Sequence, residues 1–246
     1  VQTCALPIYV MGHTNLDGNG VNGVELSYNN ELAGVPGVKV VETDRDSNEL
    51  PYTEAVTVQP VDGKNLTLTI NERIQEVVQN VAKETLAKNS AKSVSITIMN
   101  PQNGEIMAMA NAPDYNLNEP YAGGKTSKEI QEIWKNRAIS NAFEPGSIFK
   151  VMTAAAALKN NAVTDKDRFI SNGSIKIGNK LLYSDNKENY GIENFSDIIK
   201  NSDNVGFVKL GQMIGKQNFY KFIQLAGFGQ KTDIDMPGEG DRKSVV

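Results

Sequence analysis

The chain has 246 residues, of which 39% are hydrophobic, and a formal net charge of −4 at pH 7. This length suits one domain with a sizeable core or parts of two, and the acidic balance argues against a nucleic-acid-binding protein. With one histidine and one cysteine, the chain has too few ligands for a structural zinc site or a Cys–His catalytic pair, so we expect neither a metal nor another cofactor.

The two ends of the sequence differ in character from the rest. Residues 1–8 and 241–246 are typical of translated sequencing-adaptor DNA, and we leave them out of the fold prediction, as a tag would be. On this interpretation Cys4 is not native, and the true start and end of the protein are absent. The lack of a signal peptide or membrane anchor then carries no information about the intact protein.

The first part of the chain, residues 9–62, is rich in glycine and asparagine. Two short β-prone runs, 38–43 and 55–59, predict strands. The turn residues of 60–64 then indicate a domain boundary. Alternation at 66–70 predicts another strand, and the capping-box pattern at 69–72 predicts the start of a helix with apolar positions Ile74, Val77, Val78, Val81 and Leu86.

A β-hairpin and a short helix follow along the chain. Residues 93–99 and 105–110 predict two strands, and the Asn103-Gly104 pair between them is a strong turn signal. We expect the methionines of the second strand to pack in the core rather than to bind a ligand. Residues 127–134 predict a helix in which Trp134 is a packing residue.

Ser147 and Lys150 are the first candidate catalytic pair. Ser147 opens an alanine-rich run that predicts a buried helix, and Lys150 follows three positions later on the same face, where its amine can reach the serine hydroxyl. A hydroxyl beside a base is a minimal activated nucleophile. The helix dipole disfavours a cation in the first turn, and this field and the apolar surroundings lower the pKa of the lysine, as a general base requires.

A structural alternative stays open for this pair. Serine is a favoured N-cap, and the preceding Pro-Gly can form an ordinary turn. The same S-x-x-K spacing recurs at 184–187, but Ser184 lies in the polar stretch 183–191, which predicts a solvated loop. Context therefore favours Ser147 over Ser184 as the nucleophile.

Helical segments occupy the end of the chain. The first is expected to be capped by Ser196, and the next two are expected at about 205–214, stopping at Gly215, and 218–226, stopping at Gly227. The turn before the second segment carries the second candidate pair.

Ser202 and Asn204 form that second pair. They present a hydroxyl and an amide to the same space from a short turn between two helices. N-capping is again the alternative, and residues 184–186 spell the same Ser-Asp-Asn letters. We prefer 202–204 because packed helices on both sides would hold a catalytic hydroxyl rigidly.

Taken in order, these segments resemble a class B penicillin-binding protein, a D,D-transpeptidase of the serine-β-lactamase-like superfamily, over about residues 10–240. Residues 17–20, 23–25 and 28–34 resemble the non-catalytic pedestal of that family. The start of the family's transpeptidase domain is matched by residues 69–71, Gln75 and residues 100–110. Its nucleophile helix is matched by residues 136–138, 144–147 and 149–150, and its second motif by residues 202–206. The segment beyond that motif is matched by residues 227–229, 232, 234 and 237–239.

The resemblance implies an α+β fold that is serine-β-lactamase/transpeptidase-like but incomplete. Residues 9–62 would be part of a β-rich pedestal or dimerisation domain, and residues 63–240 the N-terminal part of the transpeptidase domain. The family's third motif, Lys-Thr/Ser-Gly, is absent, because 231–233 reads Lys-Thr-Asp. Ile148 also stands where the family usually has a small or hydroxyl residue. We therefore expect a fragment with two of three catalytic motifs that is inactive alone.

The resemblance also implies roles for the four candidate residues. Ser147 would attack peptidoglycan stem peptides that end in D-Ala-D-Ala, and its backbone N–H would supply half of the oxyanion hole. Lys150 would take the serine proton, Ser202 would relay a proton to the leaving D-Ala, and Asn204 would bind the substrate amide. A β-lactam antibiotic would acylate the same serine.

By the same resemblance the intact protein would work at the extracytoplasmic face of the bacterial cell membrane, in cell division or cell shape, with other cell-wall synthesis proteins and without nucleic acid. Two other functions stay open. A β-lactamase shares the first two motifs, although the pedestal-like residues 10–60 argue against it. A non-catalytic β-lactam sensor or scaffold would be acylated without forming cross-links.

Overall fold

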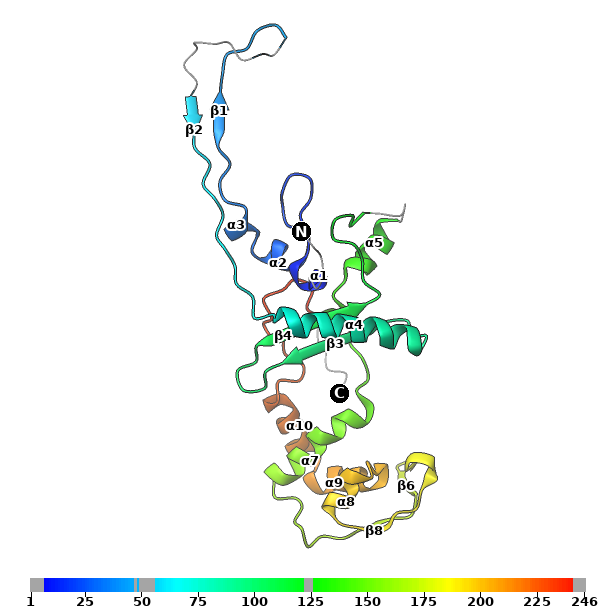
Figure 1. Cartoon of the computed structure of the whole chain (residues 1–246). Coiled ribbons are helices and arrows are strands. Elements are labelled where there is room, and N and C mark those ends of the chain that lie inside the picture. The colour runs from blue at the N-terminus through cyan, green and yellow to red at the C-terminus, as the bar shows by residue number, and fades with distance from the viewer. Residues whose placement is uncertain (1–6, 47, 49–55, 122–125, 241–246) are drawn as a thin grey trace. The chain divides into compact units, whose positions relative to one another are not determined.

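The computed structural model describes residues 7–46, 48, 56–121 and 126–240 (Figure 1). Cys4, both foreign-looking tails from 1 to 6 and from 241 onward, and Ala55 of the second predicted strand lie outside the described residues. The chain forms two compact units. The first runs up to Asn141 and resumes at Asp233, and the second comprises Ala142–Thr232.

The first unit begins with three short helices and a two-stranded ribbon. The helices are α1 (Ile8–Met11), α2 (Gly23–Ser27) and α3 (Asn29–Leu32), and the ribbon pairs β1 (Val38–Val40) with β2 (Val56–Val58) in antiparallel register. This pairing confirms the two predicted strands, although both are shorter than expected. Val38, Val40 and Val58 are more than half exposed, so these residues contribute little to the core.

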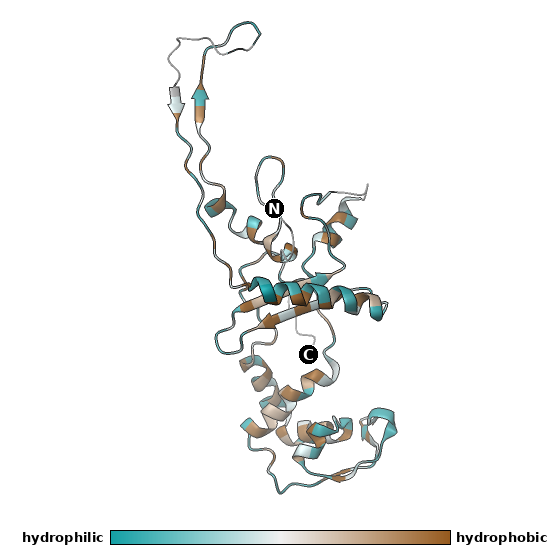
Figure 2. Ribbon diagram, viewed as in Figure 1, coloured by the Kyte–Doolittle hydropathy of each residue, from teal (hydrophilic) through white to brown (hydrophobic). Residues whose placement is uncertain are grey.

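The predicted β-hairpin and the helix before it form the main layer of the first unit (Figure 1). β3 (Val94–Met99) pairs with β4 (Ile106–Ala112), and α4 (Glu72–Lys88) packs on them. Figure 2 shows hydrophobic and hydrophilic residues alternating along α4. Its apolar contacts with the hairpin are made by one cluster of residues: Ile74, Val78, Ala82, Leu86, Val94, Ile96, Ala108, Ala110 and Ala112.

Two details before α4 differ from the sequence prediction. Residues 66–70 do not form a strand, and the N-cap of α4 is Asn71, whose side chain accepts from the Ile74 N–H at 3.2 Å. Thr69 lies two residues before this cap, and its hydroxyl donates to the Ile106 carbonyl at 2.7 Å instead. Val77 and Val81, which were expected on the apolar face, are 60% and 45% exposed, because the face that meets the hairpin is narrower than the pattern suggested.

Gln75 joins α4 to the edge of β4. Its Nε2 donates to the Met109 carbonyl at 3.0 Å, and its Oε1 accepts from the Met109 N–H at 2.8 Å. The side chain is fully buried. It therefore satisfies two backbone groups of a strand in the way that a neighbouring strand would.

The first unit is completed by two helices and the returning chain. α5 (Ser127–Trp134) coincides with the predicted helix and starts with a Thr126–Glu129 capping box. α6 (Arg137–Ser140) follows, and Ile234 and Met236 of the returning segment pack in a cluster with Val10, Val24 and Met109.

The second unit is built on four helices. They are α7 (Lys150–Lys159), α8 (Phe195–Lys200), α9 (Asn204–Ile214) and α10 (Lys216–Leu225), and a 3-10 turn, η1 (Gly146–Phe149), leads into α7. The core gathers residues from all four helices and from β5, listed here: Ala154, Ala156, Ala157, Val163, Phe169, Phe195, Ile198, Phe207, Leu210 and Ile214, with Phe219 and Phe222 against it.

The polar region around the predicted loop contains small antiparallel pairs. β5 (Phe169–Ser171) pairs with β8 (Gly191–Glu193), and β6 (Ser174–Ile177) pairs with β7 (Lys180–Tyr183), followed by the short turn η2 (Asp185–Lys187). Strands of three or four residues leave too short a pattern to recognise. The end of α9 at Gly215 is confirmed, whereas α8 is capped by Asn194 with Asp197 rather than by Ser196. No helix in the described ranges is long and apolar enough to cross a membrane.

Candidate active site

Ser147 and Lys150 lie where η1 passes into α7. Gly146, with φ of 57°, allows the chain to enter the turn. Ser147 is exposed on η1, and the Lys150 N–H donates to the Ser147 carbonyl. Lys150 is the first residue of α7 and is half-buried. The predicted three-residue spacing is therefore realised as one 3-10 turn rather than as the first turn of the buried helix.

The Lys150 ammonium is directed at the second candidate pair. Its Nζ donates to the Ser202 hydroxyl at 3.0 Å, to the Ser202 carbonyl at 2.6 Å and to the Asn204 Oδ1 at 2.6 Å. Within residues 126–240, no hydrogen bond joins Lys150 to the Ser147 hydroxyl. The structure thus brings three of the four sequence candidates into direct contact and leaves the fourth one turn away along the chain.

The turn between α8 and α9 fixes Ser202 and Asn204. Ser202 has a φ of 50°, a conformation that non-glycine residues seldom adopt. Its N–H donates to the Ile199 carbonyl at 3.1 Å. Asn204 begins α9, and its Nδ2 donates to the Tyr183 carbonyl at the end of β7 at 2.9 Å. Asn204 therefore links Lys150 to β7, with its amide oxygen committed to the ammonium.

Asp203 lies between these two residues and organises the site from behind. Its carboxylate is fully buried and caps α9 by accepting from the Val205 N–H at 3.2 Å and the Gly206 N–H at 2.6 Å. It also accepts a short hydrogen bond from the Ser184 hydroxyl. The carboxylate is thus held by groups from two separate segments.

The structure corrects the sequence-based prediction for Ser184. It was expected in a solvated loop, but its side chain is only 3% exposed. The reason is the hydrogen bond to Asp203, which lies 19 residues further along the chain and gave no local signal. Ser184 supports the second pair and is not solvated.

Glu193 is a second buried carboxyl group that sequence reasoning missed. Asn201 Nδ2 donates to its Oε1 at 2.8 Å, while its Oε2 is buried and has no hydrogen-bond partner within the described residues. Burial raises the pKa of Glu193, and the nearby Asp203 carboxylate also raises it. The only signal in the sequence was a glutamate at the end of a short apolar strand.

The electrostatics of Lys150 and Asp203 differ in a way that suits acid–base chemistry. Burial lowers the pKa of Lys150, and the Asp203 and Asp185 carboxylates oppose part of this shift. The ammonium also lies 5.4 Å from the centre of the Phe207 ring. Burial alone would raise the pKa of Asp203, but hydrogen bonds from Ser184 and the α9 backbone lower it overall. A fixed carboxylate thus lies behind a lysine that loses its proton more easily than usual.

No group of three His, Cys, Asp or Glu residues in the described part of the chain is arranged to hold a metal ion. The groups that the candidate site presents are two hydroxyls, an amine and backbone amides. A serine at the start of a helix, beside a lysine tied to a second serine, is suited to acyl transfer.

Two family models match the chain. The family model of the penicillin binding protein transpeptidase domain matches residues 94–243, which is more than half of the chain, and the model of the penicillin-binding protein dimerisation domain matches residues 10–68.

Stage V sporulation protein D of Bacillus subtilis is similar at 32% identity over 94% of this chain and 35% of its own length. Peptidoglycan D,D-transpeptidase FtsI of Escherichia coli is similar at 30% identity over 94% of this chain and 37% of its own length. The chain thus spans about a third of the length of these curated relatives.

A solved structure is also similar: penicillin binding protein 3 of Mycobacterium tuberculosis complexed with aztreonam. It aligns with a TM-score of 0.78 at 25% identity, over 98% of this chain and 49% of that one. These likenesses confirm the α+β, transpeptidase-like fold class expected from the sequence.

Proposed function

Because the chain belongs to the penicillin-binding protein transpeptidase family, we propose that it carries the nucleophile of a serine-type D,D-transpeptidase that cross-links peptidoglycan stem peptides. The observation that carries this proposal is the contact of the half-buried Lys150 amine with the Ser202 hydroxyl and the Asn204 amide. These contacts link a base of lowered pKa to a second hydroxyl, one turn from an exposed serine.

The first step is acylation of Ser147. Its Oγ adds to the carbonyl carbon of the penultimate D-Ala while its proton passes to the neutral Lys150 amine. The Ser147 backbone N–H donates to the oxyanion that forms. The proton then moves from Lys150 through the Ser202 hydroxyl to the leaving D-Ala nitrogen, the C–N bond breaks, and an ester remains on Ser147.

The second step transfers the acyl group to an amine of a neighbouring stem peptide. That amine adds to the ester carbonyl and gives up a proton to the same Lys150–Ser202 relay. The ester C–O bond then breaks, and the proton returns to the Ser147 oxygen. Asn204 would hold the substrate amide during both steps, and its own amide is prepositioned by Tyr183 and Lys150. Such prepositioning lowers the entropic cost of reaching the reactive geometry.

The domain organisation and setting are part of the same proposal. Residues 9–62 would form part of a pedestal domain and residues 63–240 the N-terminal part of the transpeptidase domain, which the two matched family models support. The protein would work at the extracytoplasmic face of a bacterial cell membrane, together with other cell-wall synthesis proteins. β-Lactams would act as mimics of the stem peptide and acylate Ser147.

The nucleophile can be tested with a fluorescent penicillin. For this test the chain would be fused to the C-terminal part of its Bacillus subtilis relative, so that the fusion contains the family's third motif. Mass spectrometry of the labelled protein should locate the adduct on the peptide that contains Ser147. Ser147→Ala should abolish labelling, and Lys150→Ala should slow it by about 10²–10⁴-fold, as expected for loss of a positioned base.

Ser196→Ala, an exposed serine of α8 outside both candidate pairs, is the matched control. Ser184→Ala removes the serine of the second S-x-x-K sequence. Because Ser184 supports Asp203, this change should slow labelling but leave the adduct on Ser147. An adduct on any residue other than Ser147 would refute the assignment. The same protein separates the alternative functions. Continuous hydrolysis of penicillin would indicate a β-lactamase, and acylation without any cross-linked product from stem peptides would indicate a sensor or scaffold.

A further inference from the structure

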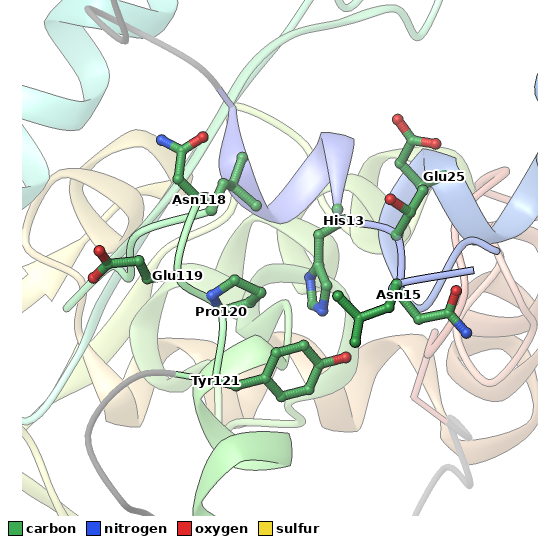
Figure 3. Close-up of a pocket in the computed structure, with 11 residues that line it drawn as sticks. His13, Asn15, Glu25, Asn118, Glu119, Pro120 and Tyr121 are labelled. Carbon is green, nitrogen blue, oxygen red and sulfur yellow. The ribbon is translucent and has the colours of Figure 1, made fainter. Parts of the chain in front are cut away.

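Two places within the described residues hold buried polar side-chain atoms that have no well-aligned hydrogen bond. The first is His13, on the wall of a pocket in the first unit. Figure 3 shows the Glu25 and Glu119 carboxylates of that pocket pointing away from the ring, so neither offers a partner to its nitrogens. The second place is in the second unit, at Glu193 and Ser171, and it adjoins the candidate active site.

Glu193 ends β8 and lies on the inner face of the β5–β8 pair. Strand pairing sets Glu193 opposite Phe169 and Gly191 opposite Ser171, so Glu193 and Ser171 lie on the same face as Phe169. Phe169 belongs to the core of the second unit, where β5 packs on α9 and β8 packs on α8 (Figure 1). The Glu193 side chain is 2% exposed. Its carboxyl group is therefore held inside the unit, beside the turn that joins α8 to α9.

The carboxyl group of Glu193 reaches the residues on both sides of Ser202. Its Oε1 accepts from the Asn201 Nδ2 at 2.8 Å, and the Asp203 carboxylate lies within hydrogen-bonding reach of the same group. Ser202, between them, has a φ of 50° and carries the hydroxyl that contacts Lys150. A residue in that sparsely populated region keeps its conformation only where its surroundings hold it. Glu193 is thus placed to hold the chain before and after Ser202.

Two adjacent buried carboxyl groups favour having only one of them ionised. Hydrogen bonds from Ser184 and the α9 backbone lower the pKa of Asp203 despite its burial, and the nearby Ser171 hydroxyl adds to this effect. Burial raises the pKa of Glu193, and the Asp203 and Asp197 carboxylates raise it further. The Glu193 Oε2 meets no donor within the described residues. Once protonated, that oxygen becomes a donor itself, and the Asp203 carboxylate is the acceptor beside it.

We propose that Glu193 is a positioning residue of the second motif, which is protonated at neutral pH and donates its O–H to the Asp203 carboxylate while its other oxygen accepts from Asn201. The link to acylation rests on the proposed function, because Glu193 acts by holding Ser202 for the relay with Lys150. The carboxyl pair then carries one negative charge instead of two.

The single charge also bears on the base. The titratable groups around the pair are Lys150 of α7, Asp185 of η2, Tyr190 before β8 and Asp197 of α8. Burial lowers the pKa of Lys150, and the Asp203 and Asp185 carboxylates oppose this shift. A second carboxylate at Glu193 would oppose it further and keep the proton on the amine. The proton on Glu193 therefore favours the neutral lysine that acylation requires.

Protonation of Glu193 can be measured on the full chain by NMR, without any activity. The glutamate Cδ atoms would be labelled with ¹³C, and the Glu193 signal identified by its loss in Glu193→Gln. At neutral pH its chemical shift should be that of a protonated carboxylic acid, whereas the exposed Glu188 should give that of a carboxylate. In Asp203→Asn the titration midpoint of Glu193 should fall by about one pH unit or more, because the neighbouring charge is gone.

A conservative variant separates the hydrogen bonds of Glu193 from its bulk. Glu193→Gln keeps an acceptor for Asn201 and a donor for Asp203, whereas Glu193→Leu fills the place and offers neither. In the fusion that contains the third motif, fluorescent penicillin should label Glu193→Gln within about twofold of the unmodified rate and Glu193→Leu about tenfold or more slowly, as loss of a hydrogen bond to a charged group predicts. Glu188→Leu is the matched control and should label at the unmodified rate.

Three results would overturn the inference: a carboxylate shift for Glu193 at neutral pH, an unchanged midpoint in Asp203→Asn, or labelling of Glu193→Gln as slow as that of Glu193→Leu. Melting curves establish that each variant is folded, and if Glu193→Leu does not fold, the NMR titration and the rate of Glu193→Gln decide. Absence of labelling at Ser147 in every protein would refute the proposed function instead, and the titration would still test the bond between Glu193 and Asp203.

Discussion

Asp203→Ala is the most direct test of how the second motif is held. The carboxylate of Asp203 is fully buried and accepts hydrogen bonds from the Val205 and Gly206 N–H groups and from the Ser184 hydroxyl. Truncation to alanine removes the cap of α9 and leaves the Ser184 hydroxyl without its partner. Because Ser202 and Asn204 flank Asp203, the same change loosens the contacts of Lys150.

The size of the effect follows from these bonds. Loss of an N-cap costs about 0.5–2 kcal/mol, and each buried group left without a partner costs about 1–3 kcal/mol. With the cap lost and one hydroxyl stranded, the free energy of unfolding should fall by about 1.5–5 kcal/mol. Asp203→Asn keeps an acceptor in place and should lose less, while Asp165→Ala, on an exposed loop, should lose almost nothing.

The effect should also depend on pH, with a definite sign. The pKa of Asp203 is lowered in the folded chain, so its ionised form stabilises the fold at pH values above its unfolded pKa of about 3.9. This contribution is lost as the pH falls through the folded pKa. The difference between the unmodified chain and Asp203→Ala should therefore be full at neutral pH and shrink in strong acid.

The assay must report on the second unit. The single tryptophan, Trp134, lies in the first unit, so its fluorescence would miss the change. Urea unfolding followed by far-ultraviolet circular dichroism, combined with hydrogen exchange of the Gly206 amide, observes α9 directly. A loss below about 0.5 kcal/mol at neutral pH, the range of ordinary surface substitutions, or unchanged protection of Gly206, would refute this account of the motif.

Three further predictions follow from buried groups. Glu193 has a raised pKa in the folded chain, so its contribution to stability is present below its unfolded pKa and is lost as the pH rises through the folded value. Glu193→Gln should reduce the difference in unfolding free energy between pH 5 and pH 8, measured by urea unfolding. A difference equal to that of the unmodified chain would contradict this account. A Cβ at Gly206 would lie 2.6 Å from Ile198 Cγ1, so Gly206→Ala should cost about 1–3 kcal/mol. Ile198→Ala removes the three side-chain atoms that this Cβ would meet, so Gly206→Ala should cost less in that background in a double-mutant cycle. Gln75→Leu leaves two backbone groups of Met109 without partners and should lower the free energy of unfolding by about 2–6 kcal/mol, whereas equal stability would show that water replaces the amide.

Local patterns were enough to predict the regular parts of the fold. The hairpin of β3 and β4 was indicated by alternation and an Asn-Gly turn, and the end of α9 was indicated by Gly215. Residues 66–70 show where this reasoning fails. They have the alternation of a strand but find no strand partner among the described residues, and strand formation depends on partners that a local pattern does not specify.

In the candidate site, too, local sequence identified some residues, and contacts between distant segments determined the rest. Ser147, Lys150, Ser202 and Asn204 could be named because each pair lies within a few residues along the chain. That Lys150 contacts Ser202 rather than Ser147 could not be predicted, since 52 residues separate the two. Ser184 and Glu193 were missed for the same reason, because their importance comes from Asp203 and Asn201, which local sequence does not connect to them.

The position of Gln75 sets the direction in which the β3–β4 sheet can grow. The outer edge of β4 is already engaged, at Met109 by Gln75 and at Met107 by the Asn71 N–H. The two-stranded sheet has one other edge, along β3, where the described residues supply no further strand. Any strand that joins this hairpin must therefore add next to β3. α4 thus blocks strand addition at the outer edge of β4. Through Gln75 it makes β4 an edge strand of the sheet, so that the sheet can be extended only from β3.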